Sequence, residues 1–235
     1  MALSIYGGYR EIKIRSEFML RLLNFTEKYR IVIQRGEIMI KTYSMIMDEL
    51  SEYGNPKTKL GRMVKKGTYT QIIKGLYETD AKTAGYLLAG SIYGPSYLSF
   101  DFALSYHGMI PESVHVFTCA TFDKKKKRAY DTPFGHFSYR DVPAKVYPLG
   151  IALETEGKYT FQIATREKAL CDKLYTMKPV TSQKGLRTML EDNLRIDMAE
   201  IRKLDAQELK AIVGAYHATN VNLLYKIYKK EAEKQ

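Results

Sequence analysis

The sequence predicts an α+β fold in which a small unit of helices and a β-hairpin precedes a larger mixed body with helices at its C-terminal end. Apolar residues recur at helical spacing over residues 42–66 and after residue 164, whereas strand-like runs of β-branched and aromatic residues dominate residues 114–163. The chain has 235 residues, 45% hydrophobic and 27% charged, so it can bury a substantial core. We expect an N-terminal extension at 1–38, a first unit at 39–80 and a body at 81–235.

Residues 1–38 alternate basic and apolar side chains without a clean period. One hypothesis is that the natural chain starts at Met39, and that Arg35-Gly36-Glu37 is the translation of a purine-rich ribosome-binding site. The alternative is an N-terminal helix around residues 18–29 that packs on the rest of the chain. Mass spectrometry of the native N-terminus distinguishes them, because a peptide covering residues 21–35 excludes the first hypothesis.

Two helices are expected in the unit at 39–80. One covers residues 42–53 and ends at Gly54. The other begins at Pro56 and ends at Gly67, and proline suits its first position because an N–H there would have no partner within the helix. Their apolar faces consist of Tyr43, Ile46, Met47, Leu50 and Tyr53, and of Leu60, Met63 and Val64. We expect these faces to pack together. Only residues 54–56 separate the helices, so no middle helix fits between them.

A β-hairpin is predicted immediately after the second helix. Residues 68–73 are rich in β-branched and aromatic side chains, Lys74-Gly75 forms a turn, and Leu76-Tyr77 begins the return strand. A basic helix followed by a hairpin is the end of a winged helix-turn-helix, shortened here by the loss of its middle helix. Such a helix fits the major groove of DNA, and the hairpin can place a lysine on the phosphate backbone.

Every charged residue between Asn55 and Tyr77 is basic. The residues expected to contact DNA are Lys57, Thr58, Lys59, Arg62, Lys65, Lys66, Tyr69 and Lys74. Of these, Thr58 is the expected reader of base edges and Lys74 the contact from the hairpin. The alternative is a solvated basic face without a ligand, which is the usual meaning of such a run.

Two more helices are expected at the start of the body. Asp80 or Thr79 caps the first, which carries Ala84, Leu87, Leu88 and Ile92. Ser99 caps the second, which ends at Gly108 and has Phe102, Ala103 and Tyr106 on its inner side. For Ser99 and Tyr97 a structural role is favoured over a catalytic one.

Strands and then helices complete the body. The expected strands cover residues 114–118, 128–130, 135–139, 146–155 and 159–163. Thr165 caps a helix that runs to Tyr175, and Leu186, Leu190, Leu194 and Ile196 mark an irregular helical segment. Asp205 and Glu208 form a reciprocal cap for the next helix. Asn220 opens the last one.

Three sequence segments are more informative about function than the hydrophobic periodicity is. They read KLGRMVKKGTYTQIIKGLY, GPSYLSFDFALSYHGMIP and IATREKALCDKLY. In this order they resemble the winged-helix signature, the PSY-S-x-x-AL-x-x-x-G-x-IP segment and the A-T-x-E-K-A-L-x-D-x-L motif of the AbiEi family. That family is the antitoxin and transcriptional-regulator half of type IV abortive-infection toxin–antitoxin systems. The resemblance covers residues 42–178.

The resemblance implies a non-enzymatic autorepressor without cofactor or metal. Such a protein binds operator DNA upstream of its own operon and counteracts a separately encoded nucleotidyltransferase toxin without forming a stable complex with it. A homodimer or cooperative binding on DNA is the associated expectation. A third option is a regulator that has no toxin.

Bulk properties agree with a cytoplasmic regulator. The net charge of +11 favours a polyanionic or acidic partner. Cys119 and Cys171 lie in apolar sequence without CxxC spacing, which predicts buried free thiols in a reducing compartment. No apolar run approaches ~18 residues, so no membrane span is expected, and the first residues lack the order of a signal peptide.

The alternative from another functional class is a metal-dependent nuclease. Asp141 with Glu156-Gly157-Lys158 matches the pattern of an acid plus E-x-K that holds a divalent ion in such enzymes, although an exposed hairpin turn reads the same way. His115 and Cys119 would lie ~13 Å apart on a strand, too far to share a metal. The run Lys124–Arg128 is either a solvated loop or a second contact, to phosphates or to an acidic partner.

Overall fold

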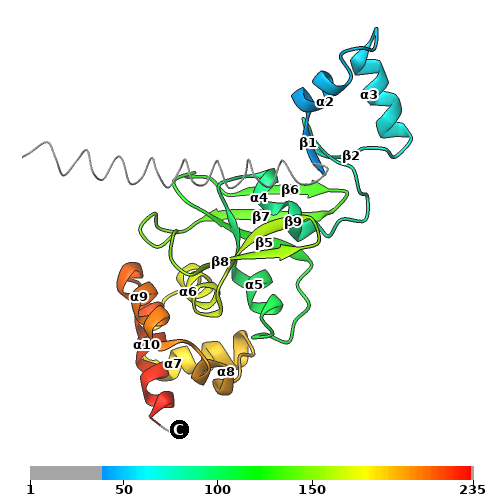
Figure 1. Cartoon of the computed structure of the whole chain (residues 1–235). Helices are drawn as coiled ribbons and strands as arrows, with labels where there is room; N and C mark the ends of the chain where they lie inside the picture. Colours follow the sequence, from blue (N-terminus) through cyan, green and yellow to red (C-terminus); the bar gives the residue numbers. More distant parts are fainter. Residues whose placement is uncertain (1–38, 234–235) are drawn as a thin grey trace, which may run out of the picture. The chain divides into compact units, whose positions relative to one another are not determined.

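The computed structural model describes residues 39–233, which form a mixed α+β fold (Figure 1). This confirms the α+β part of the predicted fold class. Both hypotheses on the N-terminal extension fall outside the described residues. One compact unit begins at Lys41 and contains all later elements, and the expected boundary at residue 80 stays a prediction. No helix within residues 39–233 has the length and apolar character to cross a membrane.

Residues 39–80 contain two helices and a small sheet. The elements are β1 (Ile40–Thr42), α2 (Tyr43–Glu49), α3 (Pro56–Lys65), β2 (Thr70–Ile73) and β3 (Leu76–Glu78), with strand order β1-β3-β2. The backbone between α2 and α3 forms only turns and bends, as predicted. Pro56 is the first residue of α3, and Gly67 adopts the left-handed φ of +75° that ends it.

The two helices and the hairpin share one hydrophobic core, as expected. It is formed by Ile46, Leu50, Leu60, Tyr69 and Tyr77, with Met47, Met63 and Val64 partly buried against it. The predicted apolar face of α2 was too wide, because Tyr43 and Tyr53 are 37% and 48% exposed. Helix α2 also ends at Glu49, four residues before the predicted end.

A six-stranded mixed sheet forms the centre of the body (Figure 1). Its order is β6 (Arg128–Thr132), β7 (Gly135–Asp141), β5 (Val116–Thr121), β4 (Tyr97–Leu98), β9 (Tyr159–Ala164) and β8 (Ile151–Glu156). The pairs β5–β7 and β4–β9 are parallel, and the other pairs are antiparallel. Strand β4 was not predicted, and β8 begins five residues later than predicted, because residues 146–149 form turns and a bend that lead into it.

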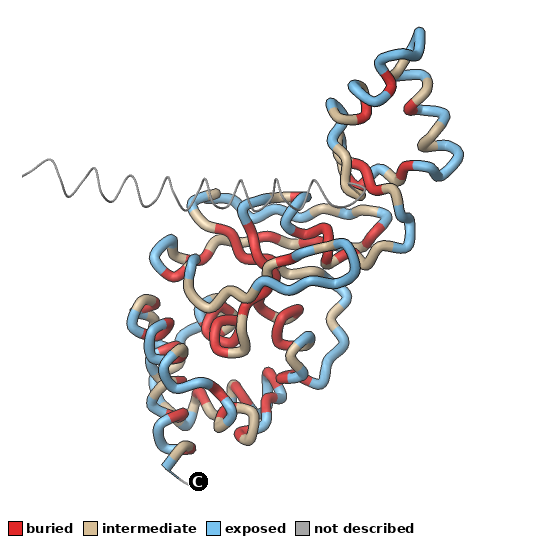
Figure 2. The backbone as a smooth tube through the Cα atoms, viewed as in Figure 1, coloured by how far each residue is buried: buried red, intermediate tan, exposed pale blue. Residues whose placement is uncertain are grey.

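Helices cover the sheet and extend to the C-terminus. They are α5 (Phe100–Tyr106), α6 (Arg166–Thr176), α7 (Gln183–Thr188), the π-helical η2 (Met189–Asn193), α8 (Met198–Arg202), α9 (Ala206–Tyr216) and α10 (Thr219–Ala232). Helix α6 packs against α5, α9 and α10. Figure 2 shows buried backbone concentrated in the strands and in the helices next to them.

The helix predicted from residue 79 or 80 does not form there. Asp80 instead accepts a hydrogen bond from the backbone N–H of Lys82, which makes a turn. The helical residues begin later, as the 3₁₀-helix η1 (Gly85–Leu88), which continues into α4 (Ala89–Ile92).

Two predicted helix caps differ from the structure, because residues at the cap form hydrogen bonds with side chains that are distant in sequence. Asp205 accepts from the N–H of Glu208 at 2.7 Å, but its own N–H donates to Glu167 of α6 rather than to Glu208. Ser99 precedes α5 without capping it and donates elsewhere.

Two further side chains are placed differently from the prediction. Tyr106 is 47% exposed and does not face inward. Asn220 lies inside α10, where its amide is buried and bonds backbone groups of residues 174–180.

Candidate nucleic-acid interface

Helix α3 presents an exposed basic face. Lys57, Thr58, Arg62 and Lys65 are exposed along one side of the helix, and Lys66 is exposed just beyond its end. No acidic residue occurs in α3. The opposite side carries Leu60, whose burial in the unit's core fixes the direction in which the basic side points.

Local sequence positions this helix firmly. The Asn55 side chain accepts a hydrogen bond from the N–H of Thr58 at 3.0 Å, which caps the first turn. Arg62 and Lys65 stand in the last turn, where the helix dipole favours positive charge. Lys57 lies in the first turn of α3, where the helix dipole disfavours a cation. The presence of a lysine at this position is therefore not explained by helix stability.

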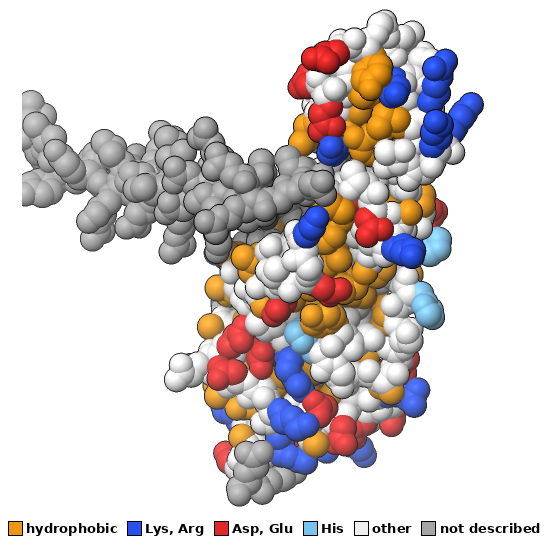
Figure 3. All heavy atoms as spheres, turned by 45° about the vertical axis from the view of Figure 1, so that its right-hand side comes forward, with side chains coloured by type: hydrophobic (Ala, Val, Ile, Leu, Met, Phe, Trp, Pro, Cys, Tyr) orange, Lys and Arg blue, Asp and Glu red, His pale blue; other side chains and the backbone are white. Residues whose placement is uncertain are grey.

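Acidic residues of this unit are separated from its basic face. They lie on α2, in the following turn and at the end of β3: Asp48, Glu49, Glu52, Glu78 and Asp80. Figure 3 shows basic side chains gathered along one side of the unit and acidic ones on another. Glu49 pairs with Lys41 at 2.8 Å and accepts from the Tyr69 hydroxyl at 3.3 Å. Within residues 39–233, no cation of α3 forms an ion pair with an acidic side chain.

The remaining predicted contacts divide into surface and core positions. Lys74 is exposed at the turn between β2 and β3, which Gly75 makes with a φ of +84°. Tyr69, in contrast, is only 6% exposed and packs edge-to-face on Tyr77. The structure therefore places Tyr69 in the core and not on the surface that DNA would meet. Lys59 is half-buried, with its Nζ 4.5 Å from the centre of the Tyr53 ring.

Gly61 is a feature of this face that sequence analysis did not single out. It lies in the middle of α3, is exposed, and a Cβ added there would meet no atom within 4 Å. Neither packing nor backbone conformation therefore requires glycine. Its position on the basic face, judged against the 3.6-residue period, could have drawn attention to it.

The proposed nuclease residues are not brought together. Asp141 ends β7 and Glu156 ends β8, and three strands lie between β7 and β8, a separation of about 19 Å at ~4.8 Å per strand. Lys158 lies in the turn after Glu156. Two carboxylates this far apart cannot hold one ion. Within the described residues no group of three His, Cys, Asp or Glu side chains is placed to bind a metal.

The body contains a fully buried charged cluster that joins two of the three specific segments. Asp172 and Lys168 of α6 are both 0% exposed and pair at 2.9 Å. Asp172 also accepts hydrogen bonds from Tyr97, Ser99 and Tyr216. With every oxygen engaged and no access to solvent, the cluster is a structural junction, which agrees with the favoured role of Tyr97 and Ser99.

Cys119 and Cys171 are buried free thiols, as predicted. Burial raises the pKa of both thiols, so they are protonated and unreactive at neutral pH. Neither thiol therefore supplies a nucleophile.

The three segments that resemble the AbiEi family occupy definite places in the fold. The first forms α3, β2 and β3, the second β4 and α5, and the third the end of β9 with α6. No known family model matches the chain, and no curated protein matches it significantly. A functional assignment therefore depends on the arrangement of these residues.

Proposed function

We propose that the protein is a DNA-binding transcriptional regulator whose residues 39–80 form a shortened winged helix. The observation that supports this most directly is the one-sided basic face of α3, followed immediately by a hairpin with an exposed lysine in its turn. A helix of this kind lies in the major groove, and the hairpin rests on the neighbouring backbone.

Each exposed residue of the face has a specific part in this proposal. The expected phosphate contacts are Lys57, Arg62, Lys65, Lys66 and Lys74. Thr58 reads a base edge from the first turn of α3, and Lys59 contributes mainly through its packing on Tyr53. Tyr69 acts indirectly, because its ring supports the core on which α3 rests.

We further infer that the body counteracts a nucleotidyltransferase toxin, as the AbiEi resemblance implies. The support is the resemblance of two of the specific segments, which hydrogen bonds to Asp172 join within the body. Autorepression and neutralisation would then reside in different parts of a cytoplasmic protein, which binds DNA as a homodimer or cooperatively. Reading the neighbouring gene tests the inference first, because the resemblance implies that it encodes a nucleotidyltransferase. Co-expression with that nucleotidyltransferase tests it further, and either its absence or unrelieved toxicity would contradict the inference.

Salt dependence tests the DNA-binding mechanism. If about five cations neutralise phosphates, the logarithm of the association constant falls with the logarithm of salt concentration at a slope of about −4 to −5. A gel shift on a DNA fragment from immediately upstream of the gene, repeated from low to moderate salt, measures this slope. A flat response would remove the electrostatic mechanism.

Charge reversal on α3 tests the location of the interface. Arg62→Glu combined with Lys65→Glu should abolish binding to the same fragment. The matched control is Lys178→Glu with Lys210→Glu, which changes net charge equally at exposed positions of the body. Equal loss in both variants would mean that total charge, and not α3, determines binding. Circular dichroism checks that both variants remain folded.

A further inference from the structure

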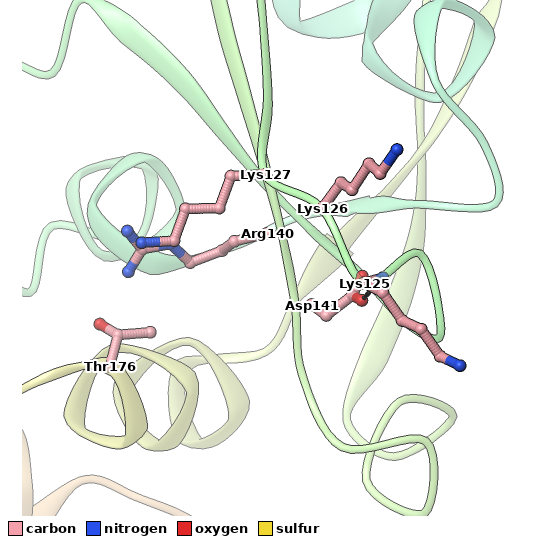
Figure 4. Close-up of a pocket in the computed structure, with 6 residues that line it drawn as sticks. All are labelled: Lys125, Lys126, Lys127, Arg140, Asp141 and Thr176. Atoms are coloured by element: carbon pink, nitrogen blue, oxygen red, sulfur yellow. Dashed lines mark hydrogen bonds between the residues drawn. The ribbon is translucent and has the colours of Figure 1, made fainter.

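The lysine run that sequence analysis left open borders a hollow in the body (Figure 4). The hollow has a volume of about 350 Å³ and is lined by Lys125, Lys126, Lys127, Arg140, Asp141 and Thr176. These residues come from the β5–β6 loop, from β7 and from the end of α6. Four basic residues and one acidic residue thus line the hollow.

Only part of the lysine run points into this hollow. In Figure 4, Lys127 and Arg140 extend to the same side of the loop, toward the end of α6 that carries Thr176, whereas Lys125 and Lys126 extend to the other side. Neither Lys127 nor Arg140 forms an ion pair or a side-chain hydrogen bond within residues 39–233. Two cationic side chains that point to the same site, with no carboxylate paired to either, attract an anion.

The only carboxylate of the hollow is already engaged. One oxygen of Asp141 accepts from the Thr121 hydroxyl at 2.6 Å, and the other accepts from the backbone N–H of Lys125 at 2.7 Å. These bonds hold the loop against β7. Asp141 therefore positions the lysine run, and within residues 39–233 it forms no ion pair with Lys127 or Arg140.

An aromatic ring supports the guanidinium from below. The Arg140 guanidinium carbon lies 5.6 Å from the centre of the Phe100 ring, which suits a cation–π contact and restricts the side chain. Phe100 is 3% exposed and has a φ of +53°, a strained value for a bulky residue. The fold thus tolerates backbone strain at the residue whose ring lies under Arg140.

We propose that Lys127 and Arg140 form a binding site for a phosphate group. The planar guanidinium can donate two parallel hydrogen bonds to phosphate oxygens, and the lysine adds a mobile charge. The site lies outside residues 39–80, so it does not depend on the proposed DNA-binding unit. The phosphate can belong to a free compound, such as a mononucleotide, or to a nucleic-acid backbone.

Calorimetric titration with inorganic phosphate, pyrophosphate and a mononucleotide tests the site, with chloride at equal ionic strength as the reference. We expect Arg140→Gln and Lys127→Gln each to weaken binding by about tenfold or more. Lys126→Gln removes the same charge from the same loop on the other side and should change affinity by less than about threefold. Lys127 is exposed, so its substitution does not threaten folding.

The source of the phosphate is decided with a short non-operator duplex, in a chain that already carries Arg62→Glu and Lys65→Glu. If Arg140→Gln weakens binding to that duplex as well as to phosphate, the group belongs to a nucleic-acid backbone. If only the small compounds lose affinity, the ligand is a free phosphate compound. Binding of phosphate no tighter than chloride, or equal losses in Lys126→Gln and Lys127→Gln, would overturn the proposal.

Discussion

Asp172 shows how a single residue can tie distant parts of this chain together. Its carboxylate is buried and accepts hydrogen bonds from Tyr97 at 2.9 Å and Ser99 at 2.6 Å, and from Tyr216 of α9. A buried carboxylate persists only when it is paired and hydrogen-bonded in this way. Burial, and after it the charge of Asp172, raise the pKa of Tyr97 and of Tyr216. Both hydroxyls therefore keep their protons and remain donors at neutral pH.

The buried tyrosines provide a matched test of this network. Tyr97→Phe and Tyr216→Phe each remove a donor to a buried charge, so each should lower the free energy of unfolding by about 1.5–3 kcal/mol. Tyr147 packs on Tyr97 with its ring centre 5.1 Å away, but its buried hydroxyl has no partner among the described residues. Tyr147→Phe should therefore be neutral or stabilising. Urea unfolding measures all three, and equal losses would contradict a special role for Asp172.

Helix α3 contains a residue that lowers the stability of the helix without a structural reason. Gly61 stands at the middle of its exposed side without any steric need for glycine. An exposed glycine costs a helix about 1 kcal/mol relative to alanine. Glycine is retained where a backbone must approach a ligand closely. On the proposed function, Gly61 would allow close contact between α3 and the wall of a DNA groove.

Gly61→Ala should consequently separate stability from binding. The variant should unfold at a higher urea concentration, by up to about 1 kcal/mol, and bind the upstream DNA fragment more weakly. Gly214→Ala is the control, because Gly214 is likewise an exposed helical glycine, in the last turn of α9, with no atom within 4 Å of an added Cβ. It should raise stability without affecting binding. Unchanged affinity in Gly61→Ala would argue against close approach of the backbone.

The bounds of an element could be predicted accurately where residues at its own ends determine them. Pro56 and Gly67 bracket α3 within one or two residues, because both act through their own backbone. The two-residue strand β4 could not be predicted, since it exists only by pairing with β5 and β9. The burial of Tyr69 was not predicted for a similar reason, because no local pattern shows that its ring enters the core with Leu60.

The candidate sites were predictable to different degrees. A continuous basic face can be read from the helical period alone, so the residues of α3 were found directly. The closeness of Lys127 to Arg140 follows from the antiparallel pairing of β6 with β7, which sets the residue before β6 beside the end of β7. Both strands were predicted from the sequence, but their register was not. The separation of Asp141 from Glu156 could not be read from the sequence either, because it follows from the order of the strands in the sheet.

At the scale of the whole molecule, the hydrophobic cores of the two parts differ greatly in size. Residues 39–80 bury five hydrophobic side chains in a cluster of their own, whereas the body buries a six-stranded sheet together with α5 and α6. Regions with few buried apolar contacts open at lower free energy than the rest of a protein. We therefore expect residues 39–80 to open locally while the body stays folded.

Hydrogen exchange measured by mass spectrometry can test this difference. Peptides from α2 and α3 should exchange faster than those from β5 and β7, which pair along six residues. Leu60→Ala removes a buried side chain at a cost of about 2–5 kcal/mol, so it should accelerate exchange in residues 39–80 alone. Leu170→Ala, in the buried part of α6, should instead accelerate exchange in the body. If Leu60→Ala accelerated exchange in β5 and β7 equally, the chain would open as one cooperative unit, and the predicted boundary at residue 80 would have no energetic meaning.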